Sequence, residues 1–160
     1  MIKFFIDQHG CAKNQVDGEI LVSKLIDDGF ELADNASDAD FIIINSCGFI
    51  ESAKKESLDA LYNVKASYPD KKVILAGCLA ERYAQVFKQD LPEADGIFGN
   101  GNLLKISDFV NSLLKKELRL FFSISNLKKI KLSAIHKIKT EIEIIKRETF
   151  AGDIFFFLII

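Results

Sequence analysis

Three short apolar runs, each leading to a glycine-flanked cysteine, constrain the fold of this chain most. The clearest is 41–45, whose four consecutive apolar residues are typical of a strand buried on both faces. It leads to Cys47, and a helical pattern follows. The runs 2–6 and 73–76 lead in the same way to Cys11 and Cys78. We therefore expect all three cysteines of the chain to lie at the carboxyl ends of parallel strands.

The rest of residues 1–118 alternates between strand and helix patterns. Strands are expected at 3–7, 30–33, 41–45, 73–76 and 96–98. Helices are expected from an N-cap at Asn14 to a C-cap near Gly29, over 47–67, over 78–91 and around 106–114. This alternation predicts an α/β fold, a doubly wound five-stranded parallel sheet. The flavodoxin-like strand order 2-1-3-4-5 would make the three cysteine-bearing strands neighbours.

Helical spacing predicts which face of each helix is buried. The expected buried positions are Val16, Ile20, Leu21 and Leu25 in the first helix, Ile50, Ala53, Leu58, Leu61 and Val64 in the second, Leu79, Tyr83, Phe87 and Leu91 in the third, and Ile106, Phe109, Val110, Leu113 and Leu114 in the last.

Charge divides the chain in two. Residues 1–118 carry 13 Lys and Arg against 19 Asp and Glu, whereas residues 119–160 carry 8 against 4. The acidic body argues against direct nucleic-acid binding, which needs a basic face. Residues 119–160 are a tail of unknown structure, in which the spacing of apolar residues is compatible with an amphipathic helix. We hypothesise that the reading frame is truncated or shifted near residue 119; the rival hypothesis is a short protein whose basic tail binds a partner.

The sequence favours a cytoplasmic location without a membrane anchor. The first residues meet a charge too early for a secretory signal, and the seven apolar residues 154–160 are too few to span a bilayer. Three cysteines, spaced by 36 and 31 residues, do not suggest a disulfide framework. They fit a reducing compartment in which thiols remain available.

Ligands of open α/β sheets bind outside the carboxyl ends of the strands, so Cys11, Cys47 and Cys78 are candidate ligands of one metal or cluster. Thiolates are the usual ligands of a 4Fe-4S cluster, and three of them leave one iron open. His9 offers a Cys3His zinc site as the alternative. Any one of these cysteines alone would be better explained as a small buried apolar residue.

Several polar residues near the cysteines have two interpretations. Asn14 and Asn45 are candidates to orient the cysteine loops by hydrogen bonds, although Asn14 also fits an ordinary N-cap. Lys13 could attract an anionic sulfur donor, or be a solvated lysine. Other functions of this fold lack their motifs, because the chain has no phosphate-binding glycine loop and no Cys-x-x-Cys.

Four segments carry a resemblance to a known family. Residues 10–17, 45–54, 76–83 and 92–99 resemble the N-terminal domain of RimO-type methylthiotransferases, radical S-adenosylmethionine enzymes of the MiaB/RimO family. The resemblance implies that the three cysteines hold an auxiliary 4Fe-4S cluster, whose open iron takes the sulfur or methylthio group from a sulfur donor. It also implies that the full-length enzyme methylthiolates an aspartate of a small-subunit ribosomal protein, whereas the sister MiaB-type enzymes act on a tRNA adenosine. Ala-Lys-Asn after Cys11 and Gly-Phe-Ile after Cys47 look more like the ribosomal-protein branch.

The chain departs from that family in two places. Gly18 stands where Ser is common, which should cost about 1 kcal/mol relative to Ala and loosen the first helical turns. The family also continues into a radical S-adenosylmethionine barrel with a Cys-x3-Cys-x2-Cys motif and a small β domain, but no cysteine follows Cys78 here. S-adenosylmethionine is therefore expected only in the full-length family enzyme, and no catalytic residue is assigned. The alternatives are a stand-alone iron-sulfur or zinc module without catalysis, and a fragment of a tRNA-directed methylthiotransferase.

Overall fold

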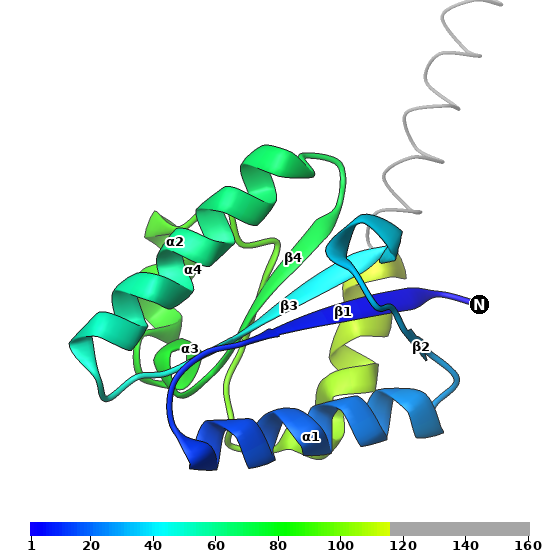
Figure 1. The fold of residues 1–160 in the computed structure, drawn as a ribbon, viewed down its shortest axis with the longest axis horizontal. Coiled ribbons are helices and arrows are strands. Elements are labelled where there is room, and N and C mark those ends of the chain that lie inside the picture. The colour runs from blue at the N-terminus through cyan, green and yellow to red at the C-terminus, as the bar shows by residue number, and fades with distance from the viewer. Residues whose placement is uncertain (116–160) are drawn as a thin grey trace, which may run out of the picture. The chain divides into compact units, whose positions relative to one another are not determined.

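The computed structural model describes residues 1–115, which form a five-stranded, all-parallel sheet with helices on both faces (Figure 1). The elements are β1 (Lys3–Gln8), α1 (Ala12–Asp27), β2 (Glu31–Leu32), β3 (Phe41–Ser46), α2 (Glu51–Ser67), β4 (Lys72–Gly77), α3 (Cys78–Arg82), α4 (Ala84–Asp90) and β5 (Gly96–Phe98), with short 3-10 turns at Ala36–Asp38 and Leu103–Lys105 and a helical segment at 106–115. The strand order is β2-β1-β3-β4-β5. The predicted doubly wound fold and its flavodoxin-like order are confirmed. The expectations for 119–160 lie outside the described residues.

The central strand β3 explains the two-layered core. All six of its residues are buried, and successive side chains of a strand point to opposite faces. Phe41 and Ile43 pack with Leu21 and Leu25 of α1 and with the 106–115 segment. Ile42 and Ile44 pack on the other face, where the core contains Leu61 of α2, Ala80 of α3 and Leu91. A parallel sheet covered on both faces needs such a continuous apolar run.

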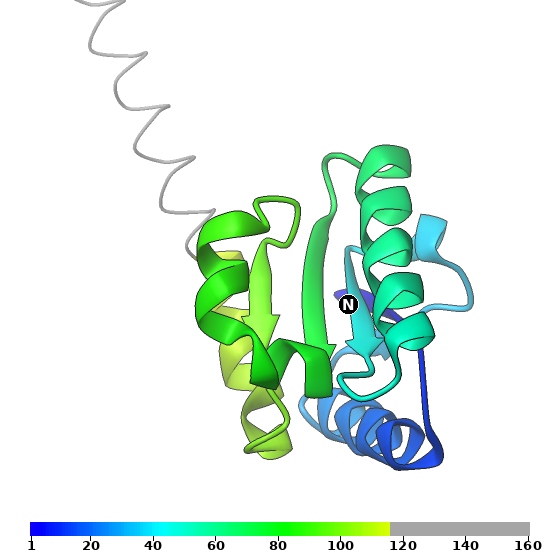
Figure 2. The ribbon, with the colours of Figure 1, turned by 90° about the vertical axis from the view of Figure 1, so that its left-hand side faces the viewer.

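The carboxyl ends of the strands gather at one edge of the sheet. Figure 2 shows the arrowheads of β3, β4 and β5 pointing the same way, toward the end at which α3 begins and the loop to α2 runs. The chain leaves this edge after each of these strands, so the loops that follow them are brought together. Among residues 1–115 no helix is long and apolar enough to cross a membrane.

Helix α1 differs from its prediction in its start and its buried face. It begins directly after Cys11, which is its N-cap residue, so the N-cap at Asn14 was wrong. Val16 and Ile20 were also predicted wrongly, since they are 54% and 39% exposed. The buried face is Asn14, Asp17, Gly18, Leu21 and Leu25. Its first two turns lie against the polar cysteine loops rather than the apolar core, so apolar spacing alone misplaced the face.

Two of the other three helices are shorter than predicted, whereas the last one covers its expected positions 106–114. Helix α2 begins at Glu51 rather than Cys47, and Ile50 is 48% exposed instead of buried. The helix expected over 78–91 is divided into α3 and α4 around Tyr83, although Leu79 and Leu91 at its ends are buried as predicted. At the end of α1, Gly29 has a φ of +90° and donates its N–H to the carbonyl of Ile26, as expected for the residue that terminates a helix.

Candidate metal centre

Strand register brings the three cysteines to one edge of the sheet. Gln8 pairs with Asn45, Asn45 pairs with Ala76, and Ser46 pairs with Gly77. Cys47 and Cys78 each follow directly after a paired residue, and Cys11 lies three residues beyond Gln8. The three cysteine-bearing strands are immediate neighbours in the order β1-β3-β4, as the sequence predicted.

Glycines allow the three cysteine loops to touch. Gly10 has a φ of +97°, and a Cβ there would lie 2.3 Å from the Cβ of Cys47. A Cβ on Gly48 would lie 2.7 Å from the carbonyl oxygen of Cys78. The Cys11 loop therefore rests on Cys47, and the Cys47 loop rests on Cys78. Any larger residue at Gly10 or Gly48 would push neighbouring loops apart.

Cys47 is the most enclosed of the three thiols, with no exposed surface. Burial acts to raise its pKa, but hydrogen bonds from the backbone N–H groups of Phe49, Ile50 and Cys11, together with the Cys11 side chain, outweigh it and hold the pKa below the ordinary 9.0. Donors aimed at a sulfur favour its thiolate form. The surroundings of Cys47 are thus suited to a thiolate, which is the form that binds metals.

Cys78 lies in a different environment. Burial raises the pKa of its thiol above 9.0; the positive charge of Lys13 opposes this shift, whereas Asp17 and the other two cysteines add to it. The side-chain amide nitrogen of Asn100 lies 3.2 Å from the Cys78 Sγ and donates to it. Cys11 and Cys47 both lie near enough to Cys78 to act on its thiol electrostatically. A nearby cation would favour the deprotonated form of each.

Two buried asparagines connect the Cys11 and Cys47 loops. The amide of Asn14 donates to the carbonyls of His9 and Asn45, at 2.7 and 3.0 Å. Asn45 donates in return to the carbonyl of Asn14 and to Oε1 of Gln8, at 2.8 and 2.7 Å. Asn14 therefore ties the cysteine loops together, as the first of its two interpretations had it, and does not cap α1.

Gly18 has a clear role in this network. A Cβ on Gly18 would lie 1.7 Å from the Nε2 of Gln8, so the glycine makes room for the side chain that accepts from Asn45. Helix α1 runs unbroken through this position. Glycine stands at position 18, where the family commonly has serine, because the side chain of Gln8 occupies the space that a Cβ would need.

Lys13 and His9 are both engaged with carboxylates. The Nζ of Lys13 lies 2.5 Å from Oδ2 of Asp17, an ion pair that raises the pKa of the lysine. The ring of His9 lies between two carboxylates, with Nε2 3.3 Å from Asp7 and Nδ1 3.6 Å from Glu56. Both ring nitrogens of His9 are buried and lack a hydrogen-bond partner among the described residues. They face carboxylates, whereas a zinc site would need one of them turned to the thiols.

The side chains as they stand do not form a single-ion site. Within the described part of the chain, no group of three or more His, Cys, Asp or Glu side chains could hold one metal ion. The ligands of a four-iron cluster bind different irons and need not converge on one point. The site fits such a group in its all-thiolate donor set, in the contact between its three loops and in the N–H donors around Cys47.

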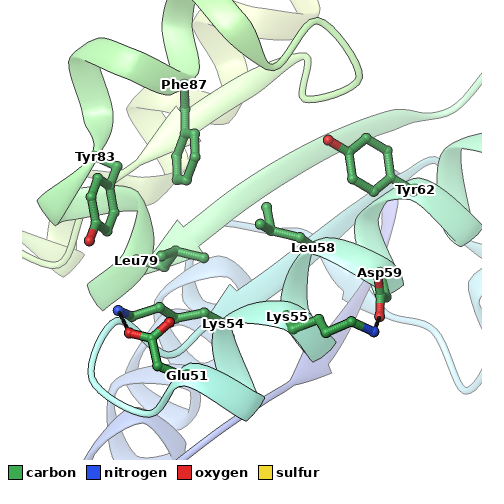
Figure 3. Close-up of a pocket in the computed structure, with 9 residues that line it drawn as sticks. All are labelled: Glu51, Lys54, Lys55, Leu58, Asp59, Tyr62, Leu79, Tyr83 and Phe87. Atoms are coloured by element: carbon green, nitrogen blue, oxygen red, sulfur yellow. Dashed lines mark hydrogen bonds and ion pairs between the residues drawn. The ribbon is translucent and has the colours of Figure 1, made fainter.

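A groove with an apolar floor lies beside this edge, between α2 and the α3–α4 pair (Figure 3). It has a volume of about 520 Å³, and Leu58 and Leu79 form its floor. Its charged side chains pair with each other, Lys54 with Glu51 and Lys55 with Asp59 (Figure 3). Leu79 directly follows Cys78 in the chain, but none of the three cysteines lines the groove. Because the four charged side chains that line the groove in the described part of the chain pair with each other, it offers no unpaired charge to bind a charged ligand.

Sequence reasoning missed several residues of the site. Asn100 and Asp17 face Cys78, and Arg82 donates to the carbonyl of Gly48 at 3.0 Å while its guanidinium lies 4.7 Å from the ring of Phe49. One signal could have found Asn100: it follows the carboxyl end of β5, the neighbour of the strand that leads to Cys78. Asp17 and Arg82 lie within the resembling segments 10–17 and 76–83, but no feature of the sequence assigned either of them a role at the site.

Comparison with known proteins gives a consistent result. The model of the family described as "Uncharacterized protein family UPF0004" matches residues 3–99. Proteins named "Ribosomal protein uS12 methylthiotransferase RimO" are similar: that of Treponema denticola is 53% identical over 112 residues, and that of Sulfurimonas denitrificans is 45% identical over 109. These matches cover 70% and 68% of this chain but 24% of each relative, so the chain spans about a quarter of their length. The extent of the family match shows that the chain belongs to the UPF0004 family.

Proposed function

We propose that residues 1–115 bind an auxiliary 4Fe-4S cluster through Cys11, Cys47 and Cys78, and that they serve as the cluster domain of a ribosomal-protein methylthiotransferase. The observation that carries the proposal is the contact between three cysteine loops at one edge of the sheet, made through Gly10 and Gly48. Three cysteine ligands suit a 4Fe-4S cluster, which when bound would keep one iron open for a sulfur species.

The residues around the thiols support this assignment. Backbone N–H groups of Phe49 and Ile50 point at the Cys47 sulfur, where they would stabilise negative charge. The paired amides of Asn14 and Asn45 hold the Cys11 and Cys47 loops at a fixed separation. The chain thus supplies fixed ligands and hydrogen-bond donors before anything binds, which lowers the cost of ordering the site.

The substrate follows from the relatives and is part of the proposal. The similar proteins bear names that assign them to ribosomal protein uS12. We infer that this domain works in the same reaction, the addition of a methylthio group to an aspartate of that protein, and that S-adenosylmethionine is used by parts of the full-length enzyme beyond this chain. A tRNA base is the competing substrate.

The cluster is tested by anaerobic reconstitution of the 160-residue chain with iron and sulfide. We expect about four iron atoms per chain and the visible absorption of a 4Fe-4S cluster. Changing Cys11, Cys47 or Cys78 separately to Ala should abolish both signals. The matched control is His9→Ala, which should retain the iron. One tightly bound zinc per chain that is lost in His9→Ala would overturn the proposal in favour of the Cys3His site.

The substrate is tested by a domain exchange. The matching segment of the Treponema denticola relative is replaced by residues 1–115 of this chain, the part that the structure describes, and the ribosomal protein and the tRNA are analysed by mass spectrometry. Methylthiolated uS12 is the expected product. Methylthiolated tRNA without modified uS12 would overturn the substrate assignment while leaving the cluster proposal standing.

A further inference from the structure

A fourth loop joins the three cysteine loops at the edge of the sheet. It is the Gly-Asn-Gly segment 99–101 after β5, and it is fastened to α3 because the N–H of Gly101 donates to Oε2 of Glu81 at 3.2 Å. A Cβ on Gly99 would lie 1.8 Å from the same carboxylate oxygen, so the loop backbone and Glu81 are packed closely. This fastening holds Asn100 over the site, where its Nδ2 reaches the Cys78 sulfur.

The orientation of the Asn100 amide is determined by its two neighbours. Its Nδ2 lies 3.2 Å from the Cys78 Sγ and 3.5 Å from Oδ2 of Asp17. A carboxylate only accepts hydrogen bonds, as does a metal-bound thiolate. The NH2 group, which has two donors, must therefore face both, and the amide oxygen must face away. Asp17 is itself buried and is held by Lys13 at 2.5 Å, so the orienting group is fixed as well.

We propose that Asn100 is a positioning residue that donates a hydrogen bond to the Cys78 sulfur and thereby raises the reduction potential of the cluster, with Asp17 and Lys13 setting the direction of the donor. This inference rests on the proposed cluster function. Reduction adds negative charge to the cluster and its sulfur ligands, and an N–H donor at a sulfur stabilises that charge. Hydrogen bonds to the sulfurs are one of the levers that set the potentials of iron-sulfur proteins.

The test compares Asn100 with Asn102, a second asparagine of the same loop region that is exposed to solvent. The variants Asn100→Ala and Asn102→Ala are reconstituted beside the unaltered chain, and each is titrated for iron content and midpoint potential. Asn100→Ala should keep about four irons and shift to a more negative potential. A tenfold change in the reduction equilibrium, about 59 mV for one electron, is expected. Asn102→Ala should not shift.

A second pair of variants preserves side-chain volume in case Ala loosens the loop. Asn100→Asp removes the donor and adds a negative charge beside the sulfur, so its potential should fall further than that of Asn100→Ala. Asn102→Asp adds the same charge farther away and should have the smaller effect.

The outcomes separate this inference from the proposed function. If the unaltered chain holds about four irons and both Asn100 variants keep the same potential as their Asn102 controls, the inference is overturned and the cluster stands. If Asn100→Ala is folded but loses its iron, the residue has a structural role and the inference also fails. If the unaltered chain holds no iron, the proposed function fails, and this inference fails with it.

Discussion

The polar groups around Asp95 are paired at the edge formed by the amino ends of the strands, here called the amino edge. At the opposite edge, formed by the carboxyl ends of the strands and here called the carboxyl edge, some buried polar groups of the described residues lack a partner. At the amino edge Asp95 accepts hydrogen bonds from Lys65 at 2.8 Å, from Lys72 at 3.0 Å and from the N–H of Val73 at 3.0 Å. Burial acts to raise the Asp95 pKa, but these donors outweigh it and hold the pKa below its ordinary 3.8. The carboxylate is satisfied within the protein.

The carboxyl edge leaves buried polar atoms open. The Oδ1 atoms of Asn14 and Asn45 are buried and have no hydrogen-bond partner among the described residues, and the three cysteines are free thiols. An unpaired buried polar atom costs stability. The comparison teaches that the sheet closes the edge at Asp95 with ion pairs, whereas the edge that carries the three cysteines leaves two buried amide oxygens open.

The largest expected effect comes from the glycine that precedes Cys78. Gly77 and Gly29 have nearly equal φ values, +92° and +90°, but a Cβ on Gly77 would lie 2.5 Å from the carbonyl oxygen of Ser46, whereas nothing lies within 4 Å of one on Gly29. Gly29→Ala should lower the free energy of unfolding by about 1 kcal/mol through backbone strain alone. Gly77→Ala should lower it by about 3 kcal/mol or more, because a clash is added to the strain.

Urea denaturation of the two variants measures this difference. Equal losses would mean that the ends of β3 and β4 are packed loosely at Ser46 and Gly77, and the close packing at this edge would be refuted.

The next effect concerns the amino edge. Asp95→Asn should lower the free energy of unfolding by about 2 kcal/mol at neutral pH, since two lysines and one N–H lose a charged acceptor. The folded-state pKa of Asp95 is depressed, so its stabilisation is present above the unfolded pKa near 3.8 and is lost as the pH falls through the folded value. The stability difference between the variant and the unaltered chain should therefore shrink below about pH 4.

Asp59→Asn is the matched control for Asp95→Asn. Asp59 also pairs with a lysine, at 2.9 Å, but both side chains are more than half exposed. The free energy of unfolding of Asp59→Asn should differ from that of the unaltered chain by less than about 0.5 kcal/mol at neutral pH. A difference for Asp95→Asn that persists unchanged at pH 2 would contradict the assignment of its effect to the carboxylate.

Sequence patterns predicted most of the fold because the spacing of apolar residues within one strand or helix is a local property of the chain. The apolar run of β3 and the cysteine after each of β1, β3 and β4 were enough to place the candidate ligands on one edge. The buried face of α1 could not be predicted in the same way. Asn14 and Asp17 are buried because loops from other strands cover them, and apolar spacing carries no information about such contacts.

The same limit explains the residues that were missed. Asn100 reaches Cys78 across 22 positions of the chain, and Gly18 is required by the side chain of Gln8 on a different element. Both roles depend on the packing of segments that are distant in sequence. The cysteines, by contrast, share a repeated local context that can be found by inspection.

The smallest effect tests whether the open groups at the carboxyl edge are held by the protein or wait for a ligand. Asn45→Ala removes the donors to Gln8 and to the Asn14 carbonyl, and should lower the free energy of unfolding of the metal-free chain by about 1.5 kcal/mol. Ser57→Ala is the control: Ser57 is also fully buried, but its hydroxyl donates to the Ala53 carbonyl within the same helix, so its loss should change stability by less than about 0.5 kcal/mol. Thermal or urea unfolding of both variants gives the answer. A neutral Asn45→Ala would mean that the amides contribute nothing until a ligand binds, and the carboxyl edge would then be assembled by its ligand rather than prepared for it.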